Sequence, residues 1–90
     1  MKHQVLFGIL LFVSLFSLAF HQRKAVKVVF FGDSITQGGV GPVGYITQMN
    51  KMFESKGLSS QYELVGAGIG GNKVYDLYLR LEDDVLSKKP

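Results

Sequence analysis

The chain of 90 residues contains no cysteine and no tryptophan, and it has only two prolines and two histidines. The absence of cysteine excludes a disulfide scaffold, a zinc site built on cysteine ligands and a cysteine nucleophile. The scarcity of proline, with 47% apolar residues, excludes a collagen-like chain and a disordered tail. The net charge of +3 is small and its basic residues are scattered, so nucleic acid is not an expected partner.

One long uncharged apolar run lies at residues 4–20, directly after a short region that contains Lys2. This order is typical of a secretory signal peptide. Ser17 and Ala19 supply the small residues of a cleavage site, so we expect a signal peptide over residues 1–19 and a secreted or periplasmic protein. The alternatives are an uncleaved membrane anchor over residues 4–20, near the lower length limit of a bilayer span, and a buried core helix. We expect contact with a membrane only through this segment.

After a polar linker over residues 20–24, the sequence predicts one small domain over residues 25–90. Residues 25–31 are apolar and rich in β-formers, which is typical of a strand buried on both faces in a parallel sheet. Residues 32–44 contain five glycines and a proline, which predicts a loop.

A helix, a strand and a glycine turn are expected next. Apolar residues at helical spacing predict a helix from Val43 to about Lys56. Its apolar stripe consists of Tyr45, Ile46, Met49, Met52 and Phe53. Residues 61–65 predict a second strand, and residues 66–71 predict a tight turn.

Asn72 is a candidate cap for a second helix. The apolar stripe predicted for this helix consists of Val74, Leu77, Tyr78, Leu81 and Val85. Arg80 lies four residues from both Asp76 and Asp84, a spacing that predicts ion pairs on a solvated helix face.

The order β-α-β-α with short turns predicts the α/β class with parallel strands. A strand that is apolar on both faces normally pairs with another strand on each side. The sequence predicts only one other strand. We therefore expect the N-terminal part of a larger doubly wound domain, with a third strand directly after Pro90. The alternative is a small two-stranded domain that is complete or dimerises.

Ser34 follows the first predicted strand in the turn Gly-Asp-Ser-Ile-Thr at residues 32–36. In open α/β sheets, ligands bind beyond the carboxyl ends of the strands, where this turn lies. A serine on such a turn has an exposed hydroxyl near backbone N–H groups that stabilise an oxyanion. The spacing differs from the nucleophile elbow of α/β-hydrolases, and aspartate and serine are also common turn formers.

Residues 66–71 match the G-x-G-x-x-G pattern of dinucleotide-binding proteins. That pattern normally follows the first strand of its unit, and its acidic partner normally ends a following strand. Here a complete strand-helix unit precedes the turn, and the acidic residues at 82–84 lie in a helical pattern. Nucleotide binding therefore stays an alternative, as does a turn whose glycines serve only the backbone.

Together, the two turns resemble the SGNH hydrolases, also called GDSL-type esterases and lipases. Residues 28–36 (VVFFGDSIT) are similar to the first signature block of that family, and residues 66–81 (GAGIGGNKVYDLYLRL) resemble the second block and the helix after it. Residues 41–45 and 84–90 also resemble the family, so the likeness covers nearly all of residues 26–90. The resemblance implies a flavodoxin-like, doubly wound, three-layer fold and a serine ester hydrolase that needs no metal or organic cofactor.

The resemblance assigns roles to three residues. Ser34 matches the nucleophile, and its backbone N–H is also an oxyanion donor. Gly71 matches the glycine whose N–H is the second oxyanion donor. Asp33 matches the aspartate before the nucleophile, which we interpret as ordering the loop. Gly66 and Gly70 depart from the asparagine and serine that are common at these places in the family.

A serine hydroxyl needs a base to take its proton. The two histidines are His3, in the apolar N-terminal segment, and His21, in the linker, and neither is expected beside Ser34. The resemblance therefore implies that an asparagine donor and the Asp and His of the base lie beyond Pro90, and that these 90 residues alone are inactive. The expected substrate is a small-molecule, carbohydrate or lipid ester. A non-catalytic binding domain, in which Ser34 is only a turn residue, is the other alternative.

Overall fold

The structure of the protein, a computed structural model, describes residues 2–19 and 24–90. The elements in chain order are α1 (Lys2–Ala19), β1 (Val26–Gly32), α2 (Ser34–Gly38), α3 (Tyr45–Ser55), β2 (Tyr62–Gly68), α4 (Val74–Asp84) and the 3-10 helix η1 (Leu86–Lys88). The predicted α/β class with parallel strands is confirmed.

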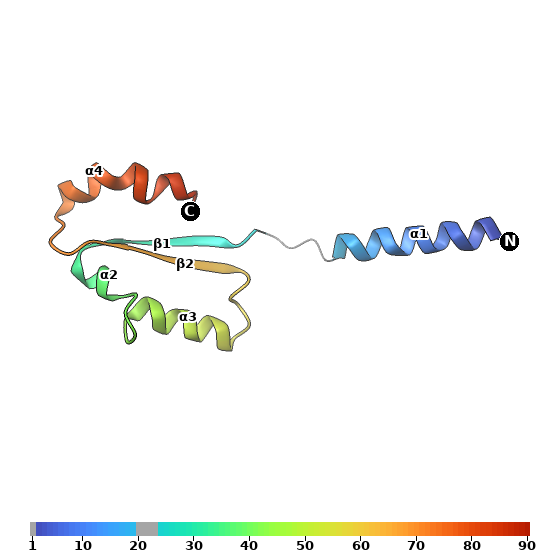
Figure 1. Cartoon of the computed structure of the whole chain (residues 1–90), viewed down its shortest axis with the longest axis horizontal. Helices are drawn as coiled ribbons and strands as arrows, with labels where there is room; N and C mark the ends of the chain where they lie inside the picture. Colours follow the sequence, from blue (N-terminus) through green and yellow to red (C-terminus); the bar gives the residue numbers. More distant parts are fainter. Residues whose placement is uncertain (1, 20–23) are drawn as a thin grey trace.

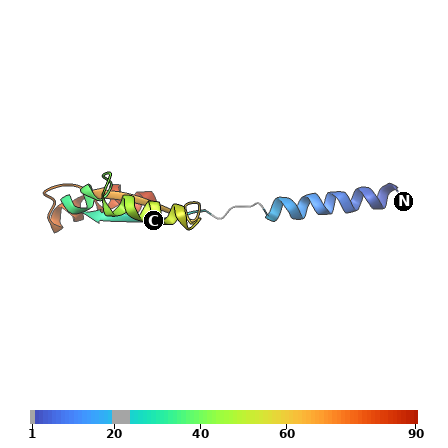
Figure 2. The ribbon, with the colours of Figure 1, turned by 90° about the horizontal axis from the view of Figure 1, so that it is seen from below.

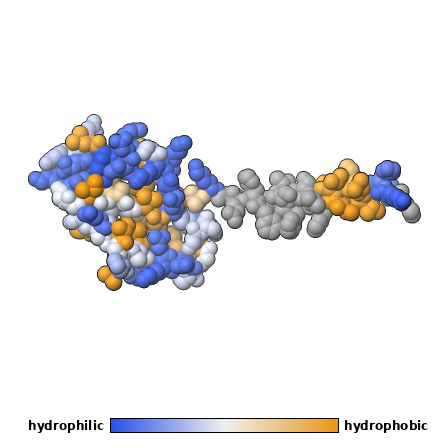
Figure 3. Space-filling model, viewed as in Figure 1, coloured by the Kyte–Doolittle hydropathy of each residue, from blue (hydrophilic) through white to orange (hydrophobic). Residues whose placement is uncertain are grey.

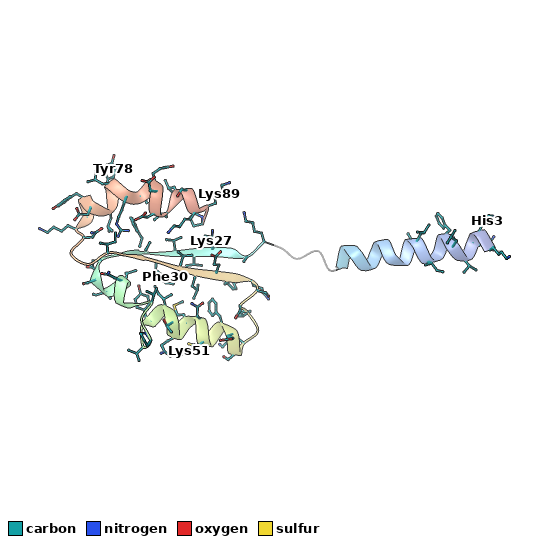
Figure 4. The ribbon with its side chains drawn as sticks, in the orientation of Figure 1. His3, Lys27, Phe30, Lys51, Tyr78 and Lys89 are labelled. Carbon is teal, nitrogen blue, oxygen red and sulfur yellow. The ribbon has the colours of Figure 1, made fainter. Side chains whose placement is uncertain are left out.

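Helix α1 covers most of the apolar N-terminal run, and His3 lies near its start (Figure 4). The apolar side chains described on it, such as Phe7, are exposed. No helix among the residues that the structure describes is long and apolar enough to cross a membrane. Most of the predicted linker, with His21, lies at residues 20–23, outside the described residues. The signal peptide over residues 1–19 stays a prediction.

The strands β1 and β2 pair in parallel, from Val26 opposite Tyr62 to Gly32 opposite Gly68. Helix α4 lies on one face of this sheet, and α2 and α3 lie on the other, which gives three layers (Figure 1). Figure 2 shows α3 running across the face that it covers. Because the pairing is parallel, both strands end at the same edge of the sheet.

The best-buried apolar side chain of the described residues is Ile46 on α3, which is 1% exposed. Met49 and Phe53 lie on the same helix face and are half-buried, as the predicted apolar stripe requires. Met52, also assigned to that stripe, is 56% exposed, so the prediction is wrong for it. Tyr45 is 40% exposed, but its ring packs edge-on against Phe30, with 5.8 Å between the ring centroids. One face of α3, over about two turns of the helix, therefore packs against the sheet.

Strand β1 is half-buried from Lys27 to Gly32, whereas the sequence predicted burial on both faces. The reason is that β2 is the only strand that pairs with β1 in the described part of the chain. Apolar atoms consequently show between the helix layers in the space-filling view (Figure 3).

The loop predicted over residues 32–44 contains the short helix α2, which the sequence analysis missed. The sequence analysis missed α2 because it has only five residues and lies in a glycine-rich loop, and glycine disfavours helices on average. The tight turn predicted over residues 66–71 is also corrected. Strand β2 continues through Gly68, so the chain turns only from Ile69 onward. Glycine is a poor strand former on average, which is why the prediction ended the strand too early.

The predicted cap of α4 is wrong. Lys73, not Asn72, occupies the N-cap position. The Asp76 carboxylate accepts a hydrogen bond of 2.8 Å from the Lys73 backbone N–H. A carboxylate in the first turn also interacts favourably with the helix dipole.

The predicted stripe of α4 is only partly correct. Leu77 and Val85 are half-buried, but Val74 and Tyr78 are 83% and 78% exposed. Tyr78 points away from the sheet (Figure 4). The face turned to the sheet instead carries Arg80, a residue that the charge pattern had assigned to solvent.

Gly68 allows α2 to lie directly on the sheet. A β-carbon at Gly68 would come within 2.1 Å of the Gln37 backbone nitrogen and 2.5 Å of the Thr36 carbonyl carbon. Both are backbone atoms of α2, so no side-chain rotation relieves the clash.

We therefore expect Gly68→Ala to destabilise the purified protein by about 2 kcal/mol, the usual cost of overpacking. Urea unfolding measures this change. Gly38→Ala is the matched control, because a β-carbon there meets no atom within 4 Å. Equal unfolding midpoints for the two variants would contradict the close packing of α2 on β2.

Candidate active site

Two turns meet at the carboxyl edge of the sheet. The first follows Gly32 and the second follows Gly68, and these two glycines pair in register. The Ile69 backbone N–H donates to the Gly32 carbonyl at 3.1 Å, which extends the strand pairing into the second turn. This bond ties the start of one turn to the start of the other.

The first turn places Ser34 at the first position of α2, where it is exposed. Asp33 is the N-cap of that helix, and its Oδ1 accepts a hydrogen bond of 3.1 Å from the Ile35 N–H. The Asp33 carbonyl accepts a second bond of 2.9 Å, from the Gln37 N–H. Both bonds of Asp33 hold the backbone that follows Ser34.

The second turn runs from Ile69 to Asn72 and is closed by a bond of 3.2 Å from the Asn72 N–H to the Ile69 carbonyl. Gly71 occupies its third position with a φ of 80°, a conformation that only glycine adopts at low cost. A β-carbon on Gly71 would meet no atom within 4 Å. Backbone conformation, rather than packing, requires glycine here.

Gln37 links the two turns. Its Oε1 accepts a hydrogen bond of 2.7 Å from the Gly70 N–H. A β-carbon on Gly70 would lie 3.8 Å from the Ser34 β-carbon, so Gly70 sits beside the serine. Gly71 is the next residue, so the structure brings the two predicted site residues Ser34 and Gly71 to one place. The sequence analysis missed Gln37, because no pattern marks a lone glutamine in a glycine-rich loop.

Arg80 was also missed, and its predicted place on a solvated face is wrong. Its side chain is only 14% exposed. The guanidinium donates to the carbonyls of Gly32 and Ala67, to the Asn72 side chain and to the Asp84 carboxylate. The spacing of four residues correctly paired Arg80 with Asp84, at 2.9 Å. The predicted pair with Asp76 is wrong, because that carboxylate caps α4 instead, and the spacing gave no sign of the backbone contacts.

The structure describes no imidazole beside Ser34. His3 lies on α1, and His21 falls outside the described residues. Residues 2–19 and 24–90 contain no cluster of three or more His, Asp or Glu side chains that could hold a metal ion.

Glycines of the nucleotide-binding pattern serve the packing of the fold. Gly66 and Gly68 lie in β2, and β-carbons on them would clash with Val40 and with α2. In a dinucleotide site, such positions let the backbone approach a pyrophosphate. Here the chain's own loop and helix occupy that space, which favours the other interpretations of the turn.

Comparison with known proteins relates the chain to esterases. It is similar to an acetylxylan esterase of Geobacillus stearothermophilus, with 33% identity over a 75-residue alignment that covers 71% of this chain and 34% of the relative. The crystal structure of the acetyl xylan esterase AlAXEase is 69% identical, with a TM-score of 0.71, over 72% of this chain and 33% of that one. The chain thus spans about a third of the length of each relative. No protein-family model matches it.

The bond between Gln37 and Gly70 predicts that Gln37→Leu loosens the second turn. Loss of one hydrogen bond costs about 1 kcal/mol, which corresponds to about fivefold faster exchange of the amides of Gly70 and Gly71. Hydrogen exchange followed by NMR measures those amides. Gln48→Leu, on the exposed surface of α3, is the matched control. Unchanged exchange in Gln37→Leu would contradict the link between the turns.

Proposed function

We propose that this chain supplies the nucleophile and two oxyanion donors of a serine ester hydrolase of the SGNH type, which removes acetyl groups from carbohydrate. The observation that carries the proposal is the placement of exposed Ser34 beside the turn of Gly70 and Gly71. The likeness to two acetylxylan esterases supports both the reaction and the substrate class.

In the proposed reaction, the Ser34 hydroxyl attacks the carbonyl carbon of the acetyl ester and gives its proton to a histidine base. The carbonyl oxygen becomes an oxyanion that accepts hydrogen bonds from the backbone N–H groups of Ser34 and Gly71. The alcohol leaves with the proton from the histidine. Water then hydrolyses the acetyl-serine, which releases acetate and restores the free hydroxyl.

The two backbone donors suit this role because their positions are fixed before the substrate binds. Removing one oxyanion donor from a hydrolase typically costs about 3 kcal/mol of transition-state stabilisation. Asp33 holds one side of the serine through its bond to Ile35, and Gln37 holds the second turn through its bond to Gly70. In the proposal, the histidine base belongs to a part of the protein outside residues 24–90.

Ser34→Ala is expected to lower acetate release from acetylated xylan by at least about 10⁴-fold, because the nucleophile is lost. Ser34 is exposed and the cap of α2 is Asp33, so circular dichroism and the melting temperature should not change. Enzymatic quantification of acetate on the full-length gene product measures the loss.

The matched control is Ser55→Ala, which removes another exposed serine, one whose hydroxyl donates to the Met52 carbonyl at 2.8 Å. A fluorophosphonate probe should label Ser34 in the wild type and in this control. Turnover retained by Ser34→Ala would overturn the assignment of the nucleophile. Activity on esters of long acyl chains, with none on acetylated xylan, would overturn the substrate class alone.

We also propose that residues 1–19 direct export and are removed after Ala19. Support comes from the apolar run after Lys2 and from the small residues at positions 17 and 19. Mass spectrometry of the protein secreted by its host should show an N-terminus at Phe20. Protein that retains Met1 would contradict cleavage, and its recovery in the membrane fraction would favour the anchor.

A further inference from the structure

We propose that Arg80 is a positioning residue that holds the predicted oxyanion donors, the N–H groups of Ser34 and Gly71, in fixed relative positions. The inference rests on the proposed function. Its support is the set of contacts by which a single guanidinium bonds to both turns at the carboxyl edge of the sheet.

Toward the first turn, Arg80 Nη2 donates to the Gly32 carbonyl at 2.8 Å. Gly32 is the last residue of β1, two positions before Ser34. The same carbonyl accepts the 3.1 Å bond from the Ile69 N–H. Arg80 thus fixes the peptide group from which the serine turn departs.

Toward the second turn, Arg80 Nε donates to Asn72 Oδ1 at 2.7 Å, and Nη1 donates to the Ala67 carbonyl at 2.9 Å. Ala67 precedes the turn and Asn72 closes it, so the guanidinium holds the segment that contains Gly71 at both ends. Ala67 pairs with Phe31 across the sheet, which places both carbonyl contacts of Arg80 at one edge.

The guanidinium itself is fixed from two further sides. Asp84 Oδ2 accepts a bond of 2.9 Å from Nη1, and the Cζ atom lies 4.5 Å from the centroid of the Phe31 ring. A planar fork with five donors makes such bridges, whereas the ammonium group of lysine has three donors at a single point. The geometry therefore depends on arginine and not on positive charge alone.

Arg80→Lys in the full-length gene product is expected to lower kcat on acetylated xylan by at least about tenfold and to leave KM within about twofold. The reason is that oxyanion donors stabilise the transition state more than the bound substrate. In Arg80→Ala, added ethylguanidinium should restore part of kcat, whereas ethylammonium at the same concentration should not. A role of positive charge alone would not distinguish these two cations, and a general loss of structure would lower the melting temperature together with kcat.

Tyr78→Ala is the matched control, because Tyr78 lies on the same helix and points into solvent (Figure 4). It should keep wild-type kcat. Asn72→Ala removes one of the bonds and keeps the others, so it tests the inference even if the Arg80 variants do not fold. We expect about fivefold lower kcat for Asn72→Ala, the effect of one lost hydrogen bond. The double variant should be no slower than Arg80→Lys, since both act through one network.

Folded Arg80→Lys and Asn72→Ala variants with wild-type kcat would overturn the inference. The same holds if ethylammonium rescues Arg80→Ala as well as ethylguanidinium does. If Ser34→Ala also keeps full activity, the proposed function itself fails. If Ser34→Ala is inactive while these variants are not, only the role of Arg80 is wrong.

Discussion

The rest of the site depends on the parallel pairing of β1 and β2, in the register that places Gly32 opposite Gly68. Parallel strands end at the same edge, so the turns that follow them meet without any long excursion of the chain. A shift of the register would separate Ser34 from the Ile69–Asn72 turn. It would also move the Gly32 carbonyl away from both of its donors, the Ile69 N–H and the Arg80 guanidinium.

This edge is built largely from backbone groups, which explains its need for glycine. Gly68 has no β-carbon because α2 lies against it, and Gly71 adopts a positive φ that other residues disfavour. The first requirement comes from packing and the second from conformation. A buried carbonyl at the end of a strand is costly without a partner. Arg80 supplies a donor to the Ala67 carbonyl and a second donor, beside the Ile69 N–H, to the Gly32 carbonyl.

Much of this fold could be predicted from the sequence, because its strands and longer helices have clear periodicity. The position of β1 and the burial of Ile46, Met49 and Phe53 on α3 were predicted correctly, whereas Met52 of the same stripe is exposed. The short helix α2 was missed because it has five residues, too few for a helical period to show. The sequence analysis ended β2 too early because glycine has a low strand propensity, although tertiary packing requires glycine at positions 66 and 68.

Arg80 shows why part of the site could not be predicted. A spacing of four residues between Arg80 and Asp84 is typical of exposed ion pairs, and that pair exists. All contacts of α4 together decide which of its faces packs against the sheet. The predicted apolar stripe favoured a different face. The stem of a long arginine packs over apolar surface while its head bonds to distant groups, so a helix can turn a charged residue inward.

The oxyanion site and the base of a serine hydrolase differ in how far apart their residues lie along the chain. An oxyanion site made of backbone N–H groups needs only two turns at one sheet edge, and residues 32–38 and 66–72 provide both. A base needs a side chain that approaches the serine from elsewhere, and its place depends on elements far along the chain. The segment that matches about a third of its esterase relatives therefore determines the geometry of Ser34 and Gly71 by contacts of its own, and in the proposed reaction the base comes from outside this segment.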